Sequence, residues 1–136
     1  MSYNLNVDSR YKNHSRKKRA KMKKQRAVQG YCDADVWNLD SYLLDLIPSM
    51  LDHLANNCHG YAPFVCKNGV KETMNETKWI DYLHDLASRF RKVSDDADRM
   101  LEESDLKSIR DRSEIIERQT KELFTELGEN LYSMWD

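Results

Sequence analysis

The chain has 136 residues, of which 33% are charged and 40% belong to the hydrophobic set. This length fits one domain with a modest core. No apolar run approaches the roughly 20 residues of a membrane-spanning helix, and the first residues lack the apolar stretch of a secretory signal. We therefore expect a cytosolic protein without membrane contacts. Only four Gly and two Pro are present, which favours long helices over many short strands.

The net charge of −1 conceals two oppositely charged segments. Residues 1–29 contain ten Lys or Arg and one acidic residue, whereas residues 30–136 contain twelve basic and twenty-two acidic residues. We predict a basic arm over 1–29 and a helical domain over 30–136. The first 12 or so residues are expected to be unstructured. The rest of the arm is expected to be flexible or partly helical, because a helix that is polar on all sides is marginal in water.

The first long helix is predicted to begin in the stretch GYCDADVWNLD, with Asp33 as N-cap and Asp35 in the first turn. Pro48 is expected to kink this helix without ending it. Asn57 or Gly60 is a candidate for a left-handed cap at its end. Its apolar residues recur at spacings of three and four, which predicts one wide stripe. The stripe comprises Val36, Leu39, Leu43, Leu46, Ile47, Met50, Leu51 and Leu54, widened by Trp37, Tyr42 and Leu44.

Two more helices are predicted in the second half of the chain. One begins near Asn75 and carries a heptad pattern from Trp79 to Met100; the other begins after Ser104 and stops at Gly128. A short hairpin around Asn68 and Gly69 is a weaker prediction. The aromatic C-terminal tail is expected to fold back. The predicted fold class is all-α, a small helical bundle of three main helices with a basic N-terminal arm.

The aspartates of the first helix could cap a helix or bind a metal ion. Asp33 and Asp40 lie two turns apart, and Asp35 lies off their line, so they do not form the i, i+3 or i+4 pair of a carboxylate site. Capping is the preferred interpretation. The other metal candidates are His53, Cys58, His59 and Cys66. The seven residues between the two cysteines do not match the close Cys pair of a structural zinc site, so buried thiols in a loop are favoured.

The chain lacks a glycine-rich phosphate loop, a nucleophile elbow and a deaminase motif. We predict that the protein is not an enzyme, has no catalytic residues and uses no cofactor. The three cysteines are expected to be reduced thiols, because their number is odd and no export signal is present.

The basic arm is the strongest functional feature, because RKKRAKMKKQR places eight cations in eleven residues. Such a segment attracts phosphate backbones and releases counterions on binding. The alternatives are an acidic protein partner, intramolecular docking on the acidic domain, and a solubilising tail. The predicted contacts to nucleic acid or to an acidic partner are Arg16, Lys17, Lys18, Arg19, Lys21, Lys23, Lys24 and Arg26.

Residues 31–90 contain three motifs: a D-x-D-V-W-x-L-D helix start at Asp33, a G-Y-x-P-like loop at Gly60 and an E-x-x-W helix at Glu76. In these motifs the segment resembles a group of small proteins encoded by tailed bacteriophages and prophages. In this chain Ala62 separates the Tyr and Pro of the loop. The group has no settled activity, so the resemblance implies a phage setting and assigns no functional residues.

We expect a phage-encoded, non-enzymatic protein, monomer or homodimer, in the cytoplasm of the host bacterium. It would bind a host or phage protein complex, with counter-defence as one such role. The alternative is a nucleic-acid-binding accessory protein that contacts DNA or RNA through the basic arm. A metal-dependent enzyme is the third hypothesis.

Overall fold

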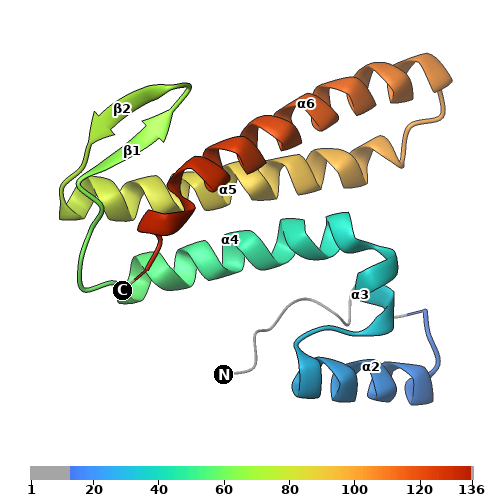
Figure 1. Cartoon of the computed structure of the whole chain (residues 1–136). Helices are drawn as coiled ribbons and strands as arrows, with labels where there is room; N and C mark the ends of the chain where they lie inside the picture. Colours follow the sequence, from blue (N-terminus) through green and yellow to red (C-terminus); the bar gives the residue numbers. More distant parts are fainter. Residues whose placement is uncertain (1–12, 136) are drawn as a thin grey trace. The chain divides into compact units, whose positions relative to one another are not determined.

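A computed structural model describes residues 13–135 of the chain, which are mostly helical (Figure 1). The first 12 residues, predicted to be unstructured, lie outside the described part. The helices are α2 (Arg16–Gln29), α3 (Asp33–Trp37), α4 (Leu39–Asn57), α5 (Glu76–Met100) and α6 (Leu106–Asn130), followed by the short helix η1 (Leu131–Ser133). The predicted helical character is therefore confirmed. The strands β1 (Phe64–Lys67) and β2 (Val70–Thr73) add a small sheet that the all-α class omits.

The chain divides into two compact units, residues 1–46 and 47–136, and the boundary falls inside α4. Within residues 13–135, no helix is both long enough and apolar enough to cross a bilayer. Each unit has its own buried residues. The domain boundary expected after residue 29 remains a prediction.

The second unit is organised around α5, which packs beside α6 (Figure 1). The predicted heptad seam forms its buried side, with Trp79, Leu83, Leu86 and Phe90 at or below 1% exposure. The Phe90 ring meets the edge of the Phe124 ring from α6 at a centroid distance of 5.5 Å. The 3.5-residue periodicity therefore predicted the buried face of α5.

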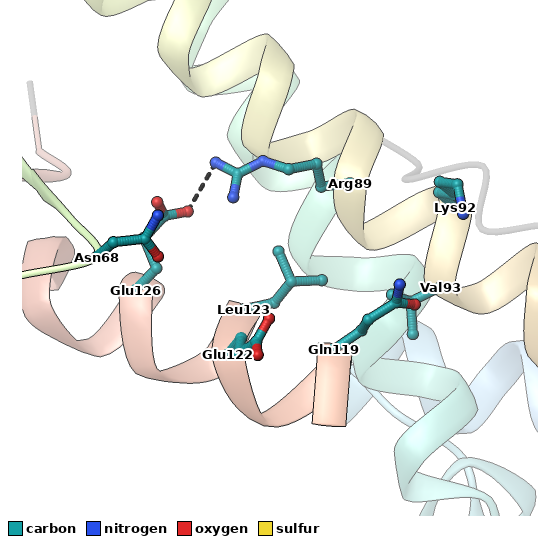
Figure 2. A pocket seen from close by; sticks show the side chains of 8 residues that line it. All are labelled: Asn68, Arg89, Lys92, Val93, Gln119, Glu122, Leu123 and Glu126. Carbon is teal, nitrogen blue, oxygen red and sulfur yellow. Dashed lines mark ion pairs between the residues drawn. The ribbon is translucent and has the colours of Figure 1, made fainter. Parts of the chain in front are cut away.

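An open hollow of about 290 Å³ lies between α5, α6 and the turn of the hairpin (Figure 2). Figure 2 shows the ion pair between Arg89 and Glu126 on this wall, with 2.7 Å between Nη2 and Oε2. Lys92 and Glu122 also line the hollow. Positively and negatively charged side chains both line this hollow, so its charge favours neither an anionic nor a cationic ligand.

The predicted hairpin is present, and its turn explains why. Phe64 pairs with Thr73 and Lys67 with Val70, so two residues connect the antiparallel strands. Asn68 and Gly69 both have positive φ, 50° and 76°. These values belong to the type I′ turn that Asn-Gly favours, and this turn matches the twist of the two strands.

The side chain of Asn130 joins the hairpin to the end of α6. Its Oδ1 accepts a hydrogen bond from the Cys66 backbone N–H at 2.8 Å, and its Nδ2 donates to the Cys66 carbonyl at 2.9 Å. Nδ2 also lies 3.1 Å from the Tyr82 hydroxyl oxygen. Asn130 is only 3% exposed. Its side chain supplies the Cys66 backbone with the two hydrogen bonds that a neighbouring strand would otherwise make.

The predicted first helix is two helices, because the backbone leaves the helical region at Asn38 (φ −122°, ψ 52°). The Asn38 side chain donates to the Ala34 carbonyl at 3.1 Å, which satisfies an acceptor at the end of α3. The break changes the phase of the apolar stripe. Val36, Trp37 and Leu39 are 57%, 74% and 55% exposed, so the prediction that they join one apolar stripe was wrong. The helix does continue through Pro48, as predicted.

Several predicted helix ends were wrong by a few residues. Helix α6 begins after Asp105, whose carboxylate accepts from the Ser108 backbone N–H, and not after Ser104. It also continues past Gly128. Gly60 does not have the positive φ of a left-handed cap. The N-cap predicted at Asn75 is confirmed, since its side chain accepts from the Lys78 N–H at 2.9 Å.

The C-terminal aromatic residues remain at the surface. Tyr132 is 94% exposed and Trp135 is 74% exposed. The prediction that this tail folds back was therefore wrong for its two aromatic side chains. The helix pair buries its seam without them.

Candidate nucleic-acid interface

The basic segment from residue 16 to residue 29 forms the continuous helix α2, which is capped at both ends. At the start, the Ser15 side chain accepts a hydrogen bond from the Lys18 backbone N–H at 3.2 Å. At the end, Gly30 adopts a left-handed conformation (φ 85°) and donates its N–H to the Arg26 carbonyl at 2.9 Å. These caps satisfy backbone groups that a helix end otherwise leaves without partners.

Apolar packing is a small part of what holds α2. Met22 is 4% exposed and clusters with Cys32, which is fully buried, and Ala34, which is 4% exposed. One methionine is a narrow apolar contact for a helix of 14 residues. Polar contacts on the same side of the helix must therefore supply much of the attachment.

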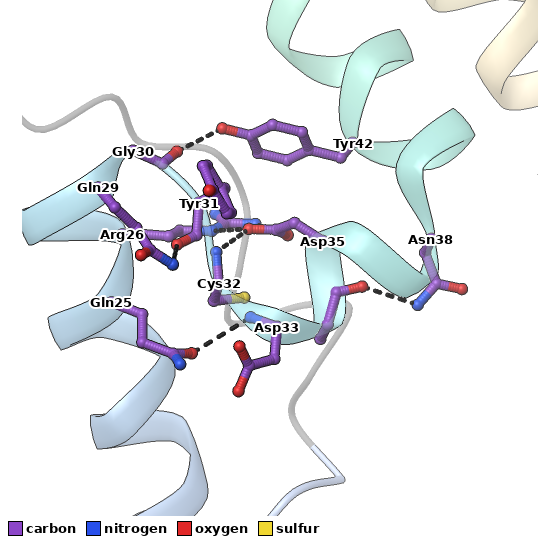
Figure 3. A network of polar contacts seen from close by, with 11 residues as sticks. Gln25, Arg26, Gln29, Gly30, Tyr31, Cys32, Asp33, Asp35, Asn38 and Tyr42 are labelled. Carbon is purple, nitrogen blue, oxygen red and sulfur yellow. Dashed lines mark hydrogen bonds and ion pairs between the residues drawn. The ribbon is translucent and has the colours of Figure 1, made fainter.

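A two-point ion pair between Arg26 and Asp35 provides that attachment (Figure 3). Arg26 Nε lies 2.8 Å from Asp35 Oδ2, and Nη2 lies 2.5 Å from Oδ1. Asp35 is 1% exposed, and the Arg26 side chain is 15% exposed. A planar guanidinium facing a carboxylate in this way fixes orientation as well as charge. The Arg26 guanidinium also lies 5.4 Å from the centre of the Tyr42 ring.

Asp35 also caps α3, so one carboxylate connects two helices. Its Oδ2 accepts the Cys32 backbone N–H at 2.8 Å, and Cys32 is the N-cap. The prediction of Asp33 as N-cap was wrong: Asp33 is the first helical residue, and its N–H donates to the Gln25 side chain at 3.2 Å. The architectural interpretation of Asp35 is confirmed. The capping carboxylate sits three residues after the cap, as in a capping box.

The environment of Asp35 lowers the pKa of its carboxyl group. Burial is the largest single influence and acts to raise this pKa. The hydrogen bonds from the Arg26 side chain and from Cys32 act in the opposite direction and outweigh it. The carboxylate is therefore charged at neutral pH, as the ion pair requires.

The Tyr42 hydroxyl makes a further contact across the turn. It donates to the Gly30 carbonyl at 2.5 Å, and Gln29 Nε2 donates to the Tyr31 carbonyl at 3.0 Å (Figure 3). Together these bonds hold the turn between α2 and α3 from both sides. Sequence reasoning missed this network. The available signal was the opposite charge of Arg26 and Asp35, nine residues apart across a glycine.

The eight predicted contact residues do not share one role. Arg26 belongs to the fold, as described above. Lys21 lies 3.7 Å from Asp33 in a solvent-exposed ion pair that stabilises little. Arg19 is half-buried, and its Nε is a buried atom without a hydrogen-bond partner among residues 13–135. The remaining predicted residues are all exposed: Arg16, Lys17, Lys18, Lys23 and Lys24.

Helical geometry places two of these cations opposite the attachment and two more to its side. Successive residues advance by about 100° around a helix, so Lys17 and Lys24 lie about 150° or more from the Met22–Arg26 side. Arg16 and Lys23 lie about 60–120° from it. The face of α2 directed away from α3 is therefore strongly cationic. No acidic residue occurs within α2 to neutralise it.

Some acidic residues of the second unit pair with basic side chains of the same unit. Asp52 lies 2.7 Å from His84 Nδ1 and 2.5 Å from Arg91 Nη2. The hydrogen bonds from these two residues lower the pKa of Asp52, although burial is the largest influence and opposes them. Asp96 pairs with Lys92 at 2.9 Å. These ion pairs place basic side chains among the carboxylates, so the acidic surface is not purely anionic.

The four candidate metal ligands are distributed over α4, the following loop and β1. His53 and His59 are exposed, whereas Cys58 and Cys66 are half-buried with free thiols. Cys58 Sγ lies 3.6 Å from the Ala55 carbonyl oxygen. Over the described part of the chain, no three His, Cys, Asp or Glu residues are arranged to hold a metal ion.

Searches of protein-family models, curated proteins and solved structures found no match to this chain.

Proposed function

We propose that this chain is a non-enzymatic binding protein that captures nucleic acid through the exposed cations of α2. The observation that carries the proposal is a capped helix with eight cations and no acid, attached by one side and cationic on the other. Phosphate contacts from Lys and Arg supply most of the affinity in sequence-independent nucleic-acid binding.

The attachment of α2 supports this role because it reduces the cost of binding. A flexible arm loses conformational entropy when a partner orders it. In α2, the caps and the Arg26–Asp35 pair already fix the backbone and the direction of the cationic face. More of the electrostatic attraction then appears as affinity.

A phage setting and a location in the host cytoplasm belong to the proposal through the sequence resemblance alone. Within that setting, the same helix would allow the protein to act on a host or viral nucleic-acid-processing or defence complex. An acidic protein partner is the second candidate, and the cationic face of α2 supports it by the same charge argument. The ion-paired acids of the second unit favour α2 over the acidic surface as the contact region.

Charge reversal on α2 tests the proposal. We expect the double variant Lys17→Glu/Lys24→Glu to reduce the affinity for fluorescein-labelled DNA by about 100-fold at low salt, because two phosphate contacts become repulsive. Fluorescence anisotropy measures this affinity.

The matched control is Lys107→Glu/Lys121→Glu, which makes the same charge change at exposed positions of α6. We expect its affinity to stay within about threefold of the wild-type value, because it leaves the α2 contacts intact. Equal losses in the two double variants would show that net charge, and not α2, governs binding. Absence of binding by the wild-type chain to duplex DNA, single-stranded DNA and RNA would refute the proposed function.

A further inference from the structure

The cations on the outer face of α2 form two rows. Lys17 and Lys24 lie two turns apart on one side of the face, and Lys21, which pairs with Asp33, lies beside them toward α3. Arg16 and Lys23 lie two turns apart on the other side. All five are exposed. A row of phosphates on one strand would meet only one of these rows at a time.

The residues between the two rows are Ala20 and Ala27, which are also exposed and lie two turns apart. Each carries only a methyl group, so the middle of the face is lower than its two cationic edges. A partner with negative charge on two sides and a floor between them would complement this profile.

We propose that this face of α2 enters the major groove of B-form duplex DNA, an inference that rests on the proposed nucleic-acid function. The groove is about 12 Å wide, and a helix with its side chains is about 10–12 Å across. Arg16 and Lys23 contact phosphates of one strand, and Lys17 and Lys24 contact those of the other. Ala20 and Ala27 lie against the base edges, where a methyl group can contact the thymine methyl group.

The direction of the amide side chains makes this binding weakly dependent on sequence. Asn and Gln read adenine through paired hydrogen bonds in the major groove. The two glutamines of α2 point toward the α3 side instead, where Gln25 accepts from the Asp33 N–H and Gln29 donates to the Tyr31 carbonyl (Figure 3). The outer face therefore presents charges and methyl groups to the DNA.

Other nucleic acids fit this face less well. Single strands are held by bases stacked on aromatic side chains, and α2 contains no aromatic residue. The major groove of A-form RNA is too deep and narrow for such an approach. An acidic peptide would need only one row of cations. The paired rows with a low centre favour duplex DNA.

A bulky side chain at the centre of the outer face tests whether α2 enters the groove, because it adds volume without changing the charge. We expect Ala20→Trp to weaken binding to a 20-base-pair DNA duplex by about tenfold or more, because the indole separates the helix from the groove floor. Binding to heparin, a polyanion without a groove, should stay within about twofold, because the charges are unchanged. Ala20→Ser is the matched control with a small side chain, and it should retain duplex affinity.

Ala27→Trp repeats the test two helical turns along the face. Circular dichroism verifies that each variant keeps its helices. Competition adds a readout that needs no variant: methyl green, which occupies the major groove, should displace the wild-type protein, and netropsin, which occupies the minor groove, should not. If the Trp variants bind duplex DNA like the wild type, groove entry is wrong although the proposed function stands. Equal wild-type affinity for duplex DNA, single-stranded DNA and duplex RNA would also overturn it. Failure to bind any of the three would instead reject the proposed function.

Discussion

Arg26 shows how one residue can be misassigned by its neighbours in the sequence. It stands in a run of cations, yet its guanidinium is directed to the buried carboxylate of Asp35 and not to solvent. Removing one partner of such a buried ion pair is strongly destabilising. The stability of the first unit therefore depends on Arg26 far more than on the exposed cations beside it.

This dependence gives a prediction for two charge-neutralising variants. We expect Arg26→Ala to destabilise the first unit by about 3 kcal/mol, because the buried Asp35 carboxylate loses its two-point ion pair. Lys24→Ala removes the same charge from the exposed face and should change stability by less than about 0.5 kcal/mol. Hydrogen exchange of the α2 backbone amides measures the change in stability in each variant. Similar protection in the two variants would contradict the anchoring role of Arg26.

The lowered pKa of Asp35 predicts an acid transition confined to the first unit. A carboxyl group with a folded pKa below its usual value of 3.8 contributes stability above pH 3.8. This contribution is lost as the pH falls through the folded-state pKa of Asp35, because protonation of the carboxylate breaks its ion pair with Arg26. Backbone NMR signals of Arg26 and Cys32 should report the transition as the pH is lowered below 3.8. In Asp35→Asn the same signals should no longer show this titration; their unchanged titration would assign it to another group.

At the scale of elements, the hairpin depends on a residue 64 positions away in the chain. Asn130 bonds both backbone groups of Cys66 while almost completely buried. Asn130→Ala should destabilise the second unit by about 2 kcal/mol, since it leaves buried backbone groups without partners. Asn56→Ala, at an exposed position of α4, is the control and should be nearly neutral. Urea unfolding measures the difference, and equal midpoints would refute the role of Asn130.

The sequence predicts elements well where the signal is local. The seam of α5, its cap at Asn75 and the Asn-Gly turn each depend on residues within a few positions of one another. The break at Asn38 was missed because the apolar spacing continues across it, and only the side-chain bond to Ala34 reveals it. The helix in the basic segment was underestimated because its partner, Asp35, belongs to another element. Contacts between elements decided these cases, and periodicity does not encode them.

At the scale of the whole molecule, charge is unevenly divided between the units. The first contains ten basic and five acidic residues, and the second contains twelve and eighteen. Among the described residues of the second unit, six acids pair with its own Arg, Lys or His side chains, namely Asp52, Glu72, Asp85, Asp96, Glu103 and Glu126. Polyanions should therefore approach the first unit and be repelled by the second.

This layout predicts the salt dependence of DNA binding. With three to five phosphate contacts from the outer face of α2, log K should fall with log salt concentration at a slope of about −3 to −5. The Lys17→Glu/Lys24→Glu variant should have a slope shallower by about two, because it loses two contacts. Anisotropy titrations between 50 and 300 mM NaCl, a range of about sixfold, measure both slopes. A flat wild-type response would show that phosphate contacts do not drive association.

Cys32 is completely buried between α2 and α3, so the alkylation rate of its thiol can report the separation of these two helices. A thiol shielded in this way reacts with an alkylating reagent only during brief excursions that separate the two helices. With Cys58 and Cys66 replaced by serine, Cys32 is the remaining thiol, and its alkylation rate would measure how often the two helices separate. DNA bound only to the outer face of α2 should leave the alkylation rate of Cys32 nearly unchanged. A ligand inserted between α2 and α3 would increase that rate.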